Sequence, residues 1–124
     1  MRDLIINLED RPGTAAAAAA ALGNAGINIE GGIGMASNGT GMMHVLVADA
    51  DAARSALQAA GIQGGGDREV EVMSIIDEPG ELGRHLQRVA DAGVNIDLMY
   101  LASNTRLVLG SPDSDGLRRA LHSS

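Results

Sequence analysis

A pair of short motifs occurs twice in this chain at one constant spacing. Asp10-Arg11-Pro12-Gly13 reappears as Asp77-Glu78-Pro79-Gly80, and Gly26-Ile27-Asn28-Ile29 reappears as Gly93-Val94-Asn95-Ile96, in both cases 67 residues later. Two separate motifs that keep one spacing indicate a repeated structural unit. We therefore expect two units, residues 1–66 and 67–124. Each unit should run through a strand, a Pro-Gly turn, a helix, a glycine and a second strand.

Apolar residues alternate in the expected strands and recur at helical spacing between them. Leu4, Ile6 and Leu8 have the period of two that indicates a strand with one buried face. The run from Ala15 to Leu22 is a strong helix former, and Gly23 and Gly26 are typical helix-stop residues. Further strands are expected at 27–35, 43–47, 69–76, 94–100 and 107–109, and further helices at 50–60, 82–91 and 113–121.

Three connecting stretches of the chain can be interpreted from their residues. Asn38-Gly39 between two strands is typical of a tight hairpin turn. Residues 64–66, three glycines, are interpreted as a flexible joint. The strand at 69–76 leads directly into the second Pro-Gly turn. It must be the last strand of the first unit, the first strand of the second, or both along its length.

The order β-α-β-β-α-β in each unit predicts a fold of the α+β class. We expect two ferredoxin-like units in tandem, with antiparallel sheets and with helices on one face of each sheet. The chain stops after the final expected helix, so we expect the second unit to lack its last strand. The exposed sheet faces then need a cover, from the same chain or from another one.

The composition limits how stable each half can be alone. Phe and Trp are absent and Tyr100 is the single aromatic residue, so the core must be built from Leu, Ile, Val, Met and Ala. A half of roughly 65 residues with such a core would be marginal by itself. We therefore expect the halves to pack on each other and the chain to form a homo-oligomer, in the simplest case a dimer.

Charge and residue types exclude several classes of function. The formal net charge is −7 and lysine is absent, which argues against a nucleic-acid partner. There is no cysteine, and the three histidines lack the spacing of a metal site. Gly31-Gly32-Ile33-Gly34 does not open a helix and so is not a dinucleotide fingerprint. We expect a cytoplasmic protein without a cofactor, without a metal and without a membrane segment.

The motif Asp-x-Pro-Gly, followed by a helix and then by Gly-Ile/Val-Asn-Ile-Glu/Asp, resembles the ACT domain family. The resemblance covers about residues 2–121, with one copy in each unit. ACT domains are regulatory modules, often found on enzymes of amino-acid metabolism, and they usually bind an amino acid between paired units at the loop before the first helix. The resemblance thus implies a non-enzymatic regulatory protein whose regulated enzyme would be a separate chain.

Carried over by position, the resemblance implies two sets of ligand-binding residues: Asp10, Gly13, Thr14 and Asn28 in the first unit, and Asp77, Gly80, Glu81 and Asn95 in the second. These residue types also suit a zwitterion. Free N–H groups at a helix N-terminus attract a carboxylate, a carboxylate of the protein suits the ammonium group, and an Asn amide can hold either end.

Each of these residues also has a purely structural interpretation. Asp10 and Asp77 can cap their own helices, the two Asn residues can serve turns, and Glu81 can act only as a partner of the helix dipole. The leading hypothesis is a sensor that binds a small amino acid at an interface between units and passes the signal to a partner protein. The alternative is an oligomerisation or protein-docking scaffold without a small-molecule ligand.

Overall fold

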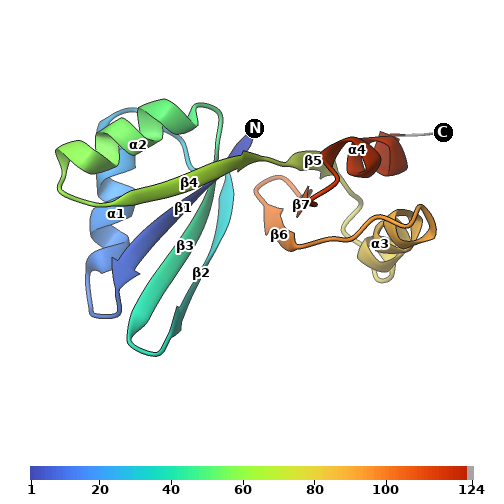
Figure 1. Cartoon of the computed structure of the whole chain (residues 1–124), viewed down its shortest axis with the longest axis horizontal. Helices are drawn as coiled ribbons and strands as arrows, with labels where there is room; N and C mark the ends of the chain where they lie inside the picture. Colours follow the sequence, from blue (N-terminus) through green and yellow to red (C-terminus); the bar gives the residue numbers. More distant parts are fainter. Residues whose placement is uncertain (123–124) are drawn as a thin grey trace. The chain divides into compact units, whose positions relative to one another are not determined.

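The computed structural model describes residues 1–122, which form two compact units, Met1–Arg68 and a second unit that begins at Glu69 (Figure 1). The first unit contains β1 (Arg2–Glu9), α1 (Thr14–Asn24), β2 (Gly31–Ser37), β3 (Thr40–Val47), α2 (Ala50–Ala59) and β4 (Gly64–Glu69). The second contains β5 (Glu71–Ser74), α3 (Glu81–Asp91), β6 (Leu98–Ala102), β7 (Arg106–Gly110) and α4 (Ser114–His122). Whether either unit folds as a domain of its own stays a prediction.

The first unit has the expected β-α-β-β-α-β order, and its strands lie side by side in the order β4-β1-β3-β2. Strand β3 is antiparallel to both of its neighbours, with Leu4 opposite Val45 on one side and Met35 opposite Met42 on the other. The hairpin between β2 and β3 turns at Asn38 and Gly39, whose φ angles of 54° and 78° are those of the tight turn that the Asn-Gly pair predicts.

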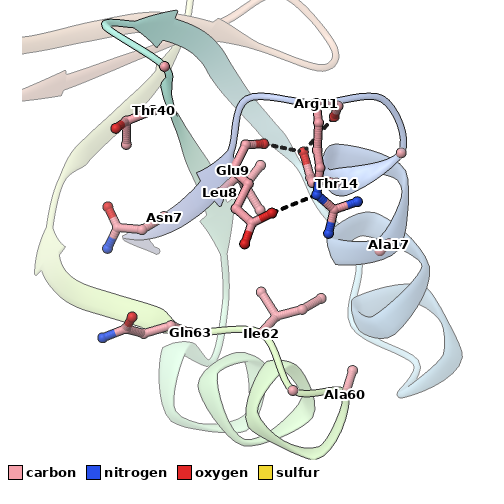
Figure 2. A pocket seen from close by; sticks show the side chains of 13 residues that line it. Asn7, Leu8, Glu9, Arg11, Thr14, Ala17, Thr40, Ala60, Ile62 and Gln63 are labelled. Carbon is pink, nitrogen blue, oxygen red and sulfur yellow. Dashed lines mark hydrogen bonds and ion pairs between the residues drawn. The ribbon is translucent and has the colours of Figure 1, made fainter.

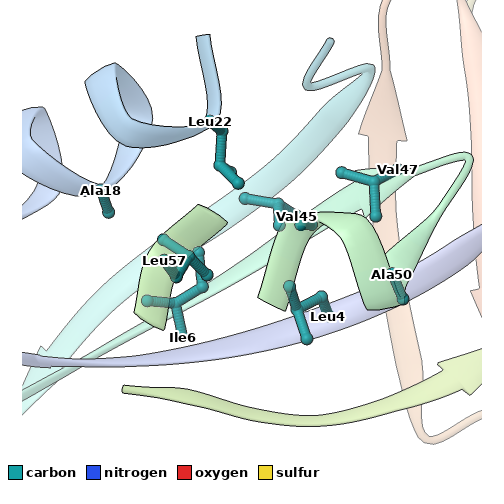
Figure 3. Close-up of a cluster of buried hydrophobic side chains, with 9 residues drawn as sticks. Leu4, Ile6, Ala18, Leu22, Val45, Val47, Ala50 and Leu57 are labelled. Atoms are coloured by element: carbon teal, nitrogen blue, oxygen red, sulfur yellow. The ribbon is translucent and has the colours of Figure 1, made fainter. Parts of the chain in front are cut away.

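The core of the first unit lies between the sheet and its two helices (Figure 3). Alternate residues of β1 and β3 point toward α1 and α2, as the period of two predicts. The buried side chains all come from these four elements: Leu4, Ile6, Ala18, Leu22, Val45, Val47, Ala50, Ala53 and Leu57. Burying one such aliphatic side chain contributes about 1.5–3 kcal/mol. The α+β fold with helices on one face of an antiparallel sheet is therefore confirmed.

The second unit repeats this plan with fewer strands. Its own strands are ordered β6-β7-β5 and are all antiparallel, with Val72 and Tyr100 both opposite Val108. Within the described residues it has no counterpart of β4. Its buried core comes from α3, β7 and α4: Val89, Leu107, Leu109, Leu117, Ala120 and Leu121.

The strands after α1 and α3 begin later than their alternating patterns predict. β2 begins at Gly31 rather than at Ile27, and β6 begins at Leu98 rather than at Val94. The preceding residues do pack against their cores, among them Ile27 and Val94. In these preceding residues the alternation of apolar side chains comes from burial alone, because pairing with a neighbouring strand begins only at β2 and β6.

The expectation of a flexible joint at residues 64–66 is wrong, because these glycines belong to strand β4. A Cβ at Gly64 would lie 3.1 Å from the Arg54 side chain, and one at Gly65 would lie 3.1 Å from the carbonyl oxygen of Ile5. The glycines therefore let the strand approach β1 and α2 closely. The expected strand at 69–76 is divided at Val70, so β4 serves the first unit and β5 the second.

Candidate functional site

The two Pro-Gly turns have the same backbone geometry. Gly13 and Gly80 are the N-cap residues of α1 and α3, and both are in the left-handed region, with φ angles of 91° and 89°. Neither helix has a side-chain hydrogen bond at its N-cap. The structural interpretation of Asp10 and Asp77 as helix caps is therefore wrong. The left-handed glycine occupies the capping position and both carboxylates are exposed.

The N-terminus of α1 presents free backbone donors. Its first internal hydrogen bond runs from the N–H of Ala17 to the carbonyl of Gly13, at 2.9 Å. The N–H groups of Thr14, Ala15 and Ala16 precede that bond and so have no acceptor within the helix. The first turn contains no acidic residue, so nothing in it competes for the positive end of the helix dipole.

Hydrogen bonds hold the loop before α1 in place (Figure 2). The hydroxyl of Thr14 donates to the carbonyl of Glu9 at 2.8 Å and to that of Arg11 at 3.2 Å. Nε of Arg11 lies 2.6 Å from a carboxylate oxygen of Glu9. The Arg11 hydrogen bond and charge lower the pKa of the exposed Glu9 carboxyl below its usual value. Glu9 and Arg11 thus neutralise each other beside the turn.

Two cavities border this loop and share Leu8, Glu9, Arg11, Gly13 and Thr14 as lining residues. The larger one, here called the α2-side cavity, has a volume of about 650 Å³ and extends to residues 60–63 after α2 (Figure 2). The smaller one, here called the β2-side cavity, has a volume of about 310 Å³. Its further lining residues come from the turn, α1, β2 and β3: Asp10, Ala15, Ala16, Gly34, Met35, Ala36, Gly41, Met42 and Met43.

The β2-side cavity brings together three of the four residues expected in the first unit, Asp10, Gly13 and Thr14. No hydrogen bond or ion pair of Asp10 is found within residues 1–122. Asn28 is exposed and lines neither cavity. It follows the C-terminus of α1, and eleven helical residues span about 16 Å. One small ligand at the turn therefore cannot reach the Asn28 of its own chain, and a role of Asn28 in binding stays a prediction.

The second turn differs from the first at the residue that begins its helix. Glu81 takes the place of Thr14, and its carboxylate accepts hydrogen bonds from Arg84 and from Nε2 of His85, the latter at 3.0 Å. The Arg84 hydrogen bond is the main cause that lowers the pKa of Glu81. Asp77, Gly80 and Asn95 are all exposed. The positive end of α3 thus already holds a carboxylate of the protein.

The sequence did not point to the methionines of the β2-side cavity. Met35 and Met42 form a cross-strand pair and remain 65% and 40% exposed. The alternation of apolar residues in a strand assigns Met35 and Met42 to one face of the sheet. It does not show that the loop after β1 lies beside them. The clue in the sequence was the number of apolar residues on both faces of the β2–β3 hairpin.

Two of the three histidines, His44 and His85, are engaged in separate local contacts. Nδ1 of His44 lies 2.7 Å from the buried carboxylate of Asp3, and His85 is buried beside Glu81. No group of three or more metal-ligating side chains is found within residues 1–122. None of the helices in that range is both long and apolar enough to cross a bilayer.

Comparison with solved structures finds this fold in proteins of low sequence identity. Protein BT0572 from Bacteroides thetaiotaomicron superposes with a TM-score of 0.85 at 25% identity, over 97% of this chain and 85% of that one. The ligand-free regulatory subunit of aspartate kinase from Thermus thermophilus gives a TM-score of 0.71 at 24% identity, over 98% and 89% of the two chains. The same subunit from Thermus flavus gives 0.70 at 25%, over 98% and 89%.

The fold is that of the aspartate kinase regulatory subunits. The first unit has the ferredoxin-like β-α-β-β-α-β order that the sequence predicted, and the second has the same order without its last strand in the described residues. No family model and no curated protein matches the sequence. The resemblance to the ACT family is therefore supported by the fold alone.

Proposed function

We propose that this chain is a regulatory module that performs no chemistry itself, binds a small amino acid at the turn before α1, and passes the signal to a separate enzyme. The observation that carries the proposal is the β2-side cavity. It combines the free N–H groups of Ala15 and Ala16 with the unpaired carboxylate of Asp10. The likeness to regulatory subunits of an enzyme supports the regulatory part.

The two ends of an amino acid match the two polar features of this cavity. The ligand carboxylate accepts from the N–H groups of the first turn of α1, where the helix dipole adds about 0.3–1 kcal/mol. The ligand ammonium pairs with Asp10. Gly13 has nothing within 4 Å of its Cβ position, so the backbone is open to close approach. The start of the helix borders the cavity, because Thr14, Ala15 and Ala16 line it.

The turn before α3 does not receive the same ligand in this proposal. The first turn of α3 already carries the carboxylate of Glu81, which pairs with Arg84 and His85. A second carboxylate at that place would meet repulsion from Glu81. The second unit then has a structural role, and the ligand stoichiometry is one per chain.

The signal would pass by linkage. A ligand that binds one arrangement of the protein more tightly than another shifts the population toward that arrangement. The exposed apolar residues Ile33, Met35 and Met42 lie together on β2 and β3, beside the cavity, and such patches mark contact surfaces. We propose that this surface pairs two copies of the chain. The same surface favours the second candidate function, an oligomerisation scaffold without a ligand.

Isothermal titration calorimetry with single amino acids tests the proposal, with Ala16→Glu as the decisive variant. Ala16 is exposed, and a Glu in the first turn stabilises the helix through its dipole while repelling the ligand carboxylate. Binding should weaken at least tenfold although the thermal midpoint does not fall. Ala20→Glu, on an exposed position of the same helix outside both cavities, should bind like the parent.

The same titrations separate the two candidate functions. If no amino acid binds the parent protein at millimolar concentration, the sensor proposal fails and the scaffold remains. If Ala16→Glu binds as well as the parent, a ligand exists but the turn before α1 is not its site.

A further inference from the structure

We propose that the amino acid bound in the β2-side cavity has a neutral, apolar side chain, either aliphatic or a thioether. This inference rests on the proposed function, because it concerns the side chain of the same ligand. It is argued from what lies in the cavity beyond the groups that hold the carboxylate and the ammonium.

The wall of the cavity away from α1 is apolar. Leu8 contributes from the end of β1, Ala36 from β2 and Met43 from β3. Their positions in the register put these three side chains on the sheet face that is turned toward α1. Methionine side chains are flexible and polarisable, so they adapt to apolar groups of different shape. A wall of this kind favours aliphatic and thioether side chains as a class, with little discrimination among the members of that class.

The charged residues of the cavity leave no partner for a charged ligand side chain. Glu9, Asp10 and Arg11 are the charged residues that line it. Arg11 is already paired with Glu9 at 2.6 Å, so an acidic side chain would find no free cation. Asp10 is engaged by the ligand ammonium, so a basic side chain would face the apolar side chains of this wall. Burying a charge without a partner is strongly unfavourable.

Polar side chains would find their partners in the other cavity. Asn7, Thr40 and Gln63 line the α2-side cavity and do not line the β2-side cavity. A preference for hydroxyl or amide amino acids would therefore place the ligand side chain on the α2 side of the turn. Because the two cavities differ in polarity, the kind of amino acid that binds indicates which cavity receives its side chain.

The first experiment is calorimetric titration of the full chain with leucine, isoleucine, valine, methionine, serine, asparagine, aspartate, glutamate, lysine and arginine. We expect the four apolar amino acids to bind within about tenfold of one another, and the charged ones to bind at least 100-fold more weakly. Tightest binding of a charged, hydroxyl or amide amino acid would overturn this inference and leave the proposed function standing. Binding of none of them would overturn this inference, and failure of the remaining amino acids to bind would overturn the proposed function as well.

A charge introduced into the apolar wall should change the preference. Ala36 is exposed, lines the cavity and lies on the face of β2 that is turned toward α1, so Ala36→Arg should fold and should place a cation beside the ligand side chain. The ratio of glutamate affinity to leucine affinity should rise at least tenfold. Met99→Arg is the control, because Met99 is 43% exposed, also lies on a strand and lines neither cavity. An unchanged ratio in Ala36→Arg would contradict the inference.

A steric variant tests the position of the side chain independently. A Cβ at Gly34 would have only the carbonyl oxygen of Met42 within 4 Å, at 3.9 Å, so Gly34→Leu can be accommodated in β2 and would fill part of the cavity. Leucine binding should fall at least tenfold. Gly66→Leu, at an open strand glycine outside both cavities, should bind normally. Equal leucine binding by both variants would show that the side chain lies elsewhere.

Discussion

Gly13 and Gly80, 67 residues apart in the sequence, have the same backbone conformation. Their φ angles are 91° and 89°, and their ψ angles are −10° and −13°. The residues after them differ, with Thr14 in the first unit and Glu81 in the second. The repeat thus preserves a turn that ends at a helix N-terminus, while the first residue of the helix is neutral in one unit and acidic in the other.

We predict that Gly13→Ala and Gly80→Ala each lower the free energy of unfolding by about 1–2 kcal/mol. The reason is that a Cβ is unfavourable in the left-handed region. Gly83→Ala should instead raise the free energy of unfolding by about 0.5–1 kcal/mol, because Gly83 lies inside α3 with open space around it and without a positive φ. Urea unfolding followed by circular dichroism measures all three. Stabilisation by Gly13→Ala would contradict the assignment of that turn.

Asp10→Asn should weaken ligand binding at least tenfold, whereas Asp77→Asn should leave it unchanged. Asp10 lines the β2-side cavity without a partner of its own in the described part of the chain, and the loss of its charge removes the partner of the ligand ammonium. Both residues are exposed and neither caps a helix, so stability should change little. Calorimetric titration with the tightest-binding amino acid provides the measurement. Equal losses in both variants would mean that both turns bind.

Asp49→Ala should lower the free energy of unfolding by about 1 kcal/mol. Asp49 is the N-cap of α2, and its carboxylate accepts a hydrogen bond from the N–H of Ala52 at 3.0 Å, an interaction of about that magnitude. Asp77→Ala, which removes an exposed aspartate that caps nothing, should change stability by less than about 0.5 kcal/mol. The comparison is made by thermal unfolding. If Asp77→Ala proved the more destabilising, the capping assignments would be wrong.

Asp67 should make stability depend on pH in the acidic range. Hydrogen bonds from Arg2 and then from Arg54 lower the pKa of Asp67 in the folded protein. Its contribution is therefore complete above its unfolded pKa of about 3.9 and is lost as the pH falls through the lower folded pKa.

The variant Asp67→Asn isolates this contribution. We expect it to be less stable than the parent by about 1 kcal/mol at pH 7, and we expect the difference to shrink as the pH falls below about 4. Urea unfolding of both proteins at a series of pH values gives that difference directly. A difference that grew toward low pH would have the wrong sign for this mechanism.

Much of the fold could be predicted because short sequence patterns indicate its strands, helices and turns. The alternation of Leu4, Ile6 and Leu8 indicated a strand with one buried face, and the Asn38-Gly39 pair indicated the hairpin. The beginning of β2 could not be predicted this way. Ile27 and Ile29 are partly buried against the core without belonging to the strand. Residues before the strand and residues within it therefore show the same alternation.

The candidate site was predictable only in part. The Pro-Gly turns and their helices were evident from the sequence, and Asp10, Gly13 and Thr14 do lie together. That Gly13 rather than Asp10 occupies the N-cap follows from the left-handed φ, which the residue types alone did not reveal. The pairing of Thr14 with the carbonyls of Glu9 and Arg11 likewise depends on the path of the turn.

The sequence by itself determined the repeat, which is a match between two stretches of the same chain. It also determined the order of helices and strands and the two glycine turns, because these depend on neighbours within a few residues. Only the tertiary structure decided that Met35 and Met42 border the turn before α1, and that residues 64–66 are a strand. It also decided that Asp67 lies between Arg2 and Arg54. These depend on which segments, distant along the chain, are brought together when the apolar faces of helices and strands are buried in one core.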